Sequence, residues 1–186
     1  MARVVCLGMS ALDAIYRVPA IPSTPTKVLA SSFTQCGGGM AANASVAVAR
    51  LGGQAAYWGG VGADDVGNRI VAELQVEGVD TRAVRYVTGA ASSSDAILVD
   101  PTGERLICAY TDPALDPDPS WLPLESIAQV DAVLADVRWP AGAVRLFAAA
   151  ASAGIPAVFD GDVGPPEALL DLARRATHVA FSQPGL

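Results

Sequence analysis

Short apolar runs alternate with longer segments through the second half of the chain. The runs at 130–135, 156–159 and 178–181 have the length and composition of buried strands. The segments between them, at 141–153 and 165–175, have the length of helices, and Gly154 follows the first of them. This order of strands and helices predicts right-handed βαβ units on a parallel sheet, and therefore an α/β fold.

The first half of the chain shows the same alternation. We expect strands at 4–8, 55–59 and 82–87. An alanine-rich helix is expected at 40–51, because Gly52-Gly53 ends it, and a second helix at 65–77 has its apolar residues at helical spacing. Asp64 or Asp65 is the natural N-cap of this second helix.

Further strand patterns do not fit this alternation. They lie at 13–18, 27–34, 93–100 and 104–110. The last two flank Asp100-Pro101-Thr102-Gly103, which has the residues of a tight turn and predicts a hairpin. We therefore expect one domain over 1–186, with a small β lid outside the main sheet formed near residues 12–35 and 92–111.

Composition limits the classes of function. The chain has 186 residues, 52% apolar content and a net charge of −7, and Lys27 is its only lysine, so we expect no nucleic-acid partner. No apolar run reaches 18 residues, so we expect no membrane span. The three cysteines are odd in number and lack metal-ligand spacing, which favours a reducing compartment, the cytoplasm.

Two glycine-rich segments carry most of the candidate chemistry. Gly37, Gly38 and Gly39 precede the alanine-rich helix, where they allow close backbone approach and supply amide donors at a positive helix end. Asn43, one turn into the helix, can donate to and accept from a pair of hydroxyls. The alternative is a loop that only turns tightly into the helix. The segment 59–67 places glycines and two carboxylates at a strand end, another position where α/β proteins bind ligands.

Other motifs are absent or weak. Gly8-Met9-Ser10 lacks the remaining glycines of a dinucleotide fingerprint, and the chain contains no Gly-Lys pair and hence no P-loop. The only histidine, His178, lies in an expected strand and is more consistent with a structural role than with a base.

Several charged residues are candidates for ligand contact. Asp13 follows the first strand and could accept hydrogen bonds from two sugar hydroxyls, or serve as a turn residue. Lys27, on an expected lid strand, and Arg138, at a strand end, could clamp an anion or be surface charges. Asp160 and Asp162 could hold Mg²⁺ or cap a helix.

The two glycine segments resemble the signatures of a known family. Gly38-Gly39-x-x-x-Asn43, followed by Arg50-Leu51-Gly52, resembles the first signature of the ribokinase-like carbohydrate kinases, the PfkB family, and 60–67 is similar to its companion segment. The resemblance implies a three-layer α/β/α core with a mostly parallel sheet, a small β lid and dimerisation through that lid. It also implies a kinase that uses ATP and Mg²⁺ to phosphorylate a sugar hydroxyl.

Within the family, the segments 133–139, 160–162 and 180–186 resemble the sulfofructose kinase branch. The resemblance implies that Lys27 and Arg138 bind the anionic end of the sugar. The branch uses an asparagine where this chain has Ala109, which puts a sulfonate in doubt and leaves an acidic or phosphorylated tail open.

The resemblance also divides the active site. It implies that Asp13, Gly38, Gly39 and Asn43 hold the sugar hydroxyls. It places the catalytic aspartate and most of the ATP site beyond residue 186, and puts Ser182-Gln183 where the family has Asn-Glu near the metal-bound phosphates. We therefore expect a chain truncated before the ATP-binding half and inactive alone. The alternatives are a non-catalytic sugar-binding or regulatory protein and, inside the family, a fructokinase, a 2-keto-3-deoxygluconate kinase or a nucleoside kinase.

Overall fold

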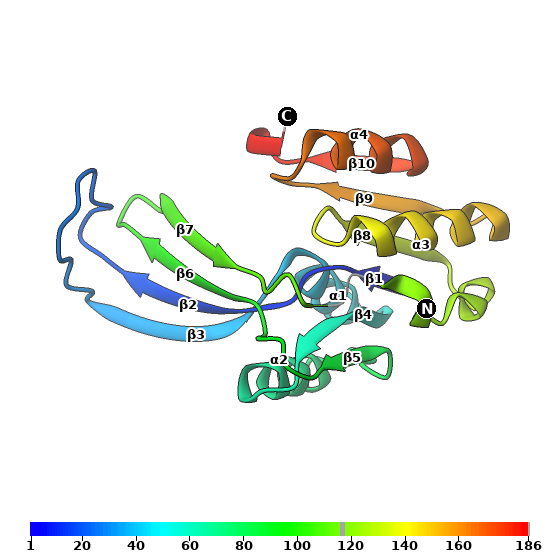
Figure 1. Ribbon diagram of the computed structural model, residues 1–186, viewed down its shortest axis with the longest axis horizontal. Coiled ribbons are helices and arrows are strands. Elements are labelled where there is room, and N and C mark those ends of the chain that lie inside the picture. Colours follow the sequence, from blue (N-terminus) through cyan, green and yellow to red (C-terminus); the bar gives the residue numbers. More distant parts are fainter. Residues whose placement is uncertain (116–117, 186) are drawn as a thin grey trace.

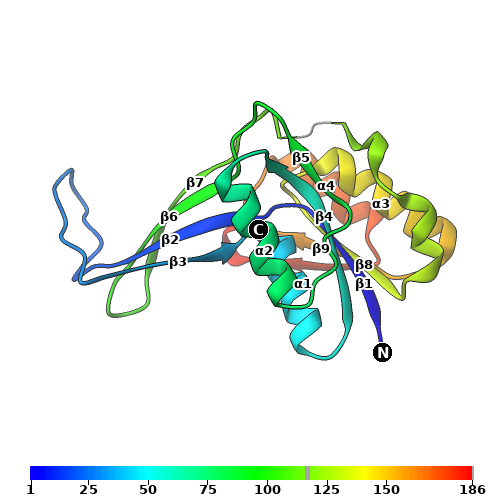
Figure 2. The same cartoon turned by 90° about the horizontal axis from the view of Figure 1, so that it is seen from below.

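The main sheet has six strands, all paired in parallel, in the order β10-β9-β8-β1-β4-β5. The computed structural model describes residues 1–115 and 118–185 (Figures 1 and 2). The strands are β1 (Arg3–Leu7), β4 (Gln54–Gly62), β5 (Val84–Val87), β8 (Ala132–Asp136), β9 (Ala157–Gly161) and β10 (His178–Phe181). The α/β fold with a parallel sheet, expected from the alternating pattern, is confirmed.

Helices cover both faces of this sheet. They are α1 (Met40–Arg50), α2 (Asp65–Val76), α3 (Pro140–Ala153) and α4 (Pro166–Arg175). Cys6 and Tyr57 belong to the apolar cluster that includes residues of α1 and α2, whereas Leu7 and Phe159 belong to the cluster with α3 and α4. Because successive strand residues point to opposite faces, the result is a three-layer α/β/α core.

A second sheet of four strands, called the lid below, extends away from the core (Figures 1 and 2). Its order is β3-β2-β6-β7, with β2 antiparallel to β3 and parallel to β6. The strands are β2 (Ala11–Arg17), β3 (Ser32–Gly38), β6 (Ser94–Val99) and β7 (Arg105–Tyr110). The hairpin predicted around Asp100 is confirmed, since β6 and β7 pair across that turn.

One lid strand was placed wrongly by the sequence pattern. The strand expected at 27–34 begins only at Ser32 and continues to Gly38, so that Gly37 and Gly38 end a strand. Residues 27–30 lie in the irregular loop between β2 and β3, at the outer end of the lid (Figure 1). Lys27 is therefore not on a lid strand.

The connections contain short 3-10 turns that the sequence did not predict. They are η1 (Pro119–Trp121), η2 (Leu124–Gln129) and η3 (Gln183–Gly185). Residues 116 and 117, in a segment rich in Pro and Asp at 113–123, and Leu186, in the segment similar to the sulfofructose kinases, lie outside the described residues. No helix in the described part of the chain is long and apolar enough to cross a membrane.

Candidate functional site

Asp13, the glycine cluster and Arg138 lie where the lid joins the core, whereas Lys27 does not. The chain leaves β1 through Gly8, Met9 and Ser10 and enters the lid, and it returns at the end of β3 to begin α1 (Figure 1). Gly38 lies directly beside Asp13, because a Cβ at Gly38 would come within 2.2 Å of the Asp13 carboxylate. Glycine at this position therefore leaves room for the Asp13 side chain.

Asp13 has a carboxylate neighbour that the sequence analysis missed. Asp13 of β2 and Asp95 of β6 are paired in register, and each has a buried Oδ1 atom without a hydrogen-bond partner. Burial, with the Asp95 charge adding to it, raises the pKa of Asp13 to about 6. Burial also raises the pKa of Asp95, while the positive charge of Arg138 opposes that rise. The unpartnered Oδ1 atoms of these two carboxylates can accept hydrogen bonds from the hydroxyls of a ligand.

One amide of the glycine cluster and two amides of the first turn of α1 have partners within the protein. The Gly37 amide donates to Glu73 Oε2 at 2.6 Å. At the start of α1, the Ala41 amide donates to Asp136 Oδ2 at 3.1 Å and the Ala42 amide to the Met9 carbonyl at 3.3 Å. The positive end of α1 is therefore partly neutralised by the Asp136 carboxylate.

The exposed Asn43 lines a hollow of about 600 Å³ between β3, α1 and α2, together with Gly38, Cys36 and Glu73. Arg138 is not among the residues that line this hollow. The sugar-binding residues implied by the resemblance thus lie along the lid–core junction. Gly38 and Asn43 line the hollow, and Asp13 lies beside Gly38.

Arg138 follows β8 and is exposed. It lines a small hollow at the junction together with Ser10, Ser93, Thr111 and Trp139. Among the described residues, no carboxylate forms an ion pair with its guanidinium. Lys27 lies in the outer loop of the lid, so the structure does not bring Lys27 and Arg138 together within this chain (Figure 1).

The described residues contain no cluster of metal ligands. Within residues 1–115 and 118–185, no group of three or more His, Cys, Asp or Glu side chains could hold a metal ion. Asp162 accepts a hydrogen bond from Ser182 Oγ at 2.6 Å, and burial together with the Asp162 charge raises the pKa of Asp160. Asp160 and Asp162, the candidate Mg²⁺ ligands, therefore lack the third carboxylate, thiol or imidazole of a metal-binding group within residues 1–115 and 118–185.

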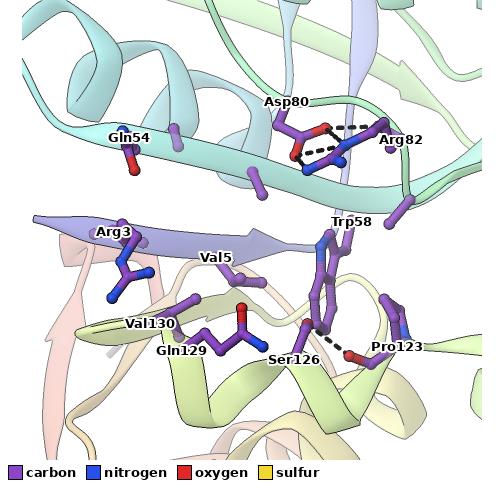
Figure 3. A pocket seen from close by; sticks show the side chains of 14 residues that line it. Arg3, Val5, Gln54, Trp58, Asp80, Arg82, Pro123, Ser126, Gln129 and Val130 are labelled. Atoms are coloured by element: carbon purple, nitrogen blue, oxygen red, sulfur yellow. Dashed lines mark hydrogen bonds and ion pairs between the residues drawn. The ribbon is translucent and has the colours of Figure 1, made fainter.

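A further hollow, of about 500 Å³, lies over the first residues of β1 and β4 (Figure 3). Trp58 and Val5 form its floor, and the ion pair of Arg82 with Asp80, with Nη2 and Oδ2 2.6 Å apart, lies at its edge. None of the predicted site residues lines it.

The model of the pfkB family carbohydrate kinases matches residues 1–185. The chain belongs to the PfkB family. A solved structure from Agrobacterium tumefaciens, described as that of a ribokinase, is 42% identical with a TM-score of 0.93. That alignment covers 99% of this chain and 60% of the solved one.

Named relatives of this PfkB chain act on different sugars. Fructokinase-1 of Oryza sativa subsp. japonica is 38% identical over 87 residues, which cover 47% of this chain and 27% of the relative. An ATP-dependent ribose-1-phosphate kinase of Halopiger xanaduensis is 31% identical over 160 residues, covering 86% of this chain and 54% of the relative. The chain thus spans about a quarter and about half of these relatives.

The companion glycine segment of this PfkB chain anchors the lid. Asp64 caps α2 by accepting the Gly67 amide at 2.7 Å, as predicted. The same carboxylate accepts the amide and the hydroxyl of Ser92, at 2.8 and 2.6 Å, just before β6. Burial opposes ionisation, but these hydrogen bonds outweigh it and lower the pKa of Asp64. Asp64 of this segment therefore ties the start of α2 to the start of the second lid hairpin.

Proposed function

We propose that residues 1–186 form the N-terminal part of one ribokinase-like domain and supply its sugar-binding side. The kinase would transfer the γ-phosphate of ATP, with Mg²⁺, to a hydroxyl of a ketose-like sugar. The observation that supports this most is the Asp13–Asp95 pair, whose unpartnered oxygens lie beside Gly38 at the lid–core junction. The catalytic base and most of the ATP site would come from later sequence, as the resemblance implies. The free thiols of Cys6, Cys36 and Cys108 are compatible with the cytoplasm expected above.

We further propose that the sugar carries an anionic tail. Support comes from Arg138, an exposed guanidinium at the junction without an ion-pair partner among the described residues. Two features favour a neutral ketose instead. Lys27 lies in the outer loop, and Ala109, paired with Asp95, offers no side-chain donor.

An assay of ADP release tests the proposed reaction. The 186-residue chain, with ATP and Mg²⁺, is expected to release ADP no faster with fructose, 6-deoxy-6-sulfofructose, fructose phosphates, 2-keto-3-deoxygluconate or a nucleoside than without sugar. Phosphoryl transfer depends on positioning and electrostatic stabilisation, which half a site does not supply. A longer protein that includes the proposed later sequence is expected to contain a Gly-x-Gly-Asp motif and to release ADP with at least one of these sugars.

The outcomes separate the alternatives. Turnover by the 186-residue chain would show that the base lies within it and would contradict the division of the site. Saturable sugar binding without ADP release by the longer protein would support a non-catalytic sensor. Arg138→Ala is expected to weaken binding of 6-deoxy-6-sulfofructose at least tenfold and leave fructose unchanged. An equal loss for both sugars would contradict the anionic tail.

We also propose that the lid pairs with a second copy of the chain. Every residue of β7 is exposed, and it carries the apolar side chains Leu106, Ile107 and Tyr110. An exposed apolar strand at a sheet edge is a surface that another chain can cover. Ile107→Asp is expected to shift the chain from dimer to monomer in sedimentation equilibrium. Val163→Asp, at an exposed valine after β9, is the matched control and should leave the dimer intact. A monomeric wild type would contradict the proposal.

A further inference from the structure

Asp136 is the last residue of β8, and no part of it is exposed to solvent. Its Oδ2 atom accepts the amides of Met9 at 2.8 Å and Ala41 at 3.1 Å, and its Oδ1 atom accepts the amide of Arg138 at 2.9 Å. These amides belong to three separate segments: the turn from β1 into the lid, the first turn of α1, and the loop after β8. One buried carboxylate therefore connects three of the segments at the lid–core junction.

The surroundings of Asp136 leave it little freedom to move. A Cβ at Gly8 would lie 2.3 Å from its carboxylate, so the end of β1 passes directly over it. Burial raises the pKa of Asp136 to about 6, although the three amide hydrogen bonds oppose the rise. A buried charge of this kind is tolerated where backbone donors and a helix N-terminus stabilise it.

We propose that Asp136 is a positioning residue of the sugar site. It holds the turn that leads to Asp13, the start of α1 after Gly39, and the loop of Arg138 in one arrangement, without touching the sugar itself. The proposal rests on the proposed function only in placing the sugar at this junction. Loss of the three hydrogen bonds would let the segments move independently, and displaced binding groups weaken binding.

Asp136→Asn, compared with Asp131→Asn, tests this role. Asp131 is the matched control, because it precedes β8 at the opposite end and also accepts a backbone amide, that of Arg3 at 2.7 Å. An asparagine at 136 presents one acceptor and one donor to the three amides. Amide hydrogen exchange, followed by NMR, is expected to quicken about tenfold or more at Met9, Ala41 and Arg138 in Asp136→Asn and to stay unchanged there in Asp131→Asn.

Fructose affinity, measured by calorimetry on the same proteins, gives the functional readout. Asp136→Asn is expected to weaken it about tenfold, and Asp131→Asn to leave it unchanged. Unchanged exchange at the three amides, or a uniform increase across β1 and β8, would overturn the proposal. The wild type could bind neither fructose nor 6-deoxy-6-sulfofructose while exchange at the three amides still quickens in Asp136→Asn. The proposed function and the positioning role in sugar binding would then fail. The structural connection through Asp136 would stand.

A titration of the wild-type chain covers the case in which Asp136→Asn does not fold. The amide proton shifts of Met9, Ala41 and Arg138 are expected to move together, with one midpoint near pH 6, as the carboxylate gains a proton. Asp160 on β9 is the other carboxylate that acts on Asp136, and its own midpoint is read separately from its side-chain carbon. Cys6 on β1 and Tyr57 on β4, whose pKa values are raised by burial, stay neutral in this range. Different midpoints for the three amides would overturn the proposal.

Discussion

Asp13→Asn is expected to weaken fructose binding by about 10- to 100-fold, the range for losing hydrogen bonds to a charged acceptor. The carboxylate lies beside Gly38 with one oxygen buried and unpartnered, so the structure offers that atom to a ligand donor. The amide of asparagine keeps the shape but replaces one acceptor oxygen with a donor. Calorimetric titration of both proteins at pH 7 measures the difference.

The same substitution is expected to stabilise the sugar-free chain at pH 7. The pKa of Asp13 in the folded chain is about 6, above its unfolded value near 3.9. Between these values the folded chain holds a proton that the unfolded chain has lost, so stability falls as the pH rises through this window. Asp13→Asn removes this cost. Because the side chain is only partly buried and solvent screens its charge, the gain is about 1 kcal/mol.

Asp100→Asn provides the matched control in the lid hairpin. Asp100 accepts the Thr102 hydroxyl and backbone amides in the turn, and these hydrogen bonds lower its pKa. Its ionised form therefore stabilises the fold above the unfolded pKa, and that contribution is lost as the pH falls. Asp100→Asn should leave fructose affinity unchanged and lower the stability at pH 7. Equal fructose affinity for wild type and Asp13→Asn would remove Asp13 from the sugar site.

The parts of the fold with a clear period were predictable from the sequence. The strands and helices after residue 126 and the hairpin at Asp100 lie within a few residues of their predicted places. β3 was misplaced because its first four residues are exposed. An exposed segment does not need the alternating apolar residues from which a half-buried strand is predicted. The apolar Val28 and Leu29 instead suggested a strand four to five residues too early.

The site was predictable only in part, because some of its residues become neighbours only when strands far apart in the sequence pair. The glycines could be predicted because they belong to a short motif, and Asp13 because it follows the first expected strand. Asp95 becomes a neighbour of Asp13 only through the pairing of β2 with β6, which local sequence does not specify. Asp136 appears in the sequence as a polar residue at a strand end. Its three amide partners come from segments brought together only by the parallel order of β1 and β8 and the return of the chain into α1.

Gly39→Ala is expected to lower the free energy of unfolding by about 3 kcal/mol, the sum of backbone strain and steric overlap. Gly39 precedes α1 with a φ of 94°, a conformation that L side chains rarely adopt. A Cβ there would lie 2.5 Å from the Met9 carbonyl oxygen and 2.6 Å from the Ser10 Cα. Both are backbone atoms of the turn from β1 into the lid, so no side-chain rotation can relieve the overlap.

Gly52→Ala separates the two contributions. Gly52 follows α1 with a φ of 84°, and a Cβ there would have no atom within 4 Å. Its substitution should therefore cost only the strain, about 1 kcal/mol. Urea unfolding followed by tryptophan fluorescence measures both variants against the wild type. A Gly39→Ala cost equal to that of Gly52→Ala would mean that the turn yields readily. The start of α1 would then not be packed rigidly against that turn.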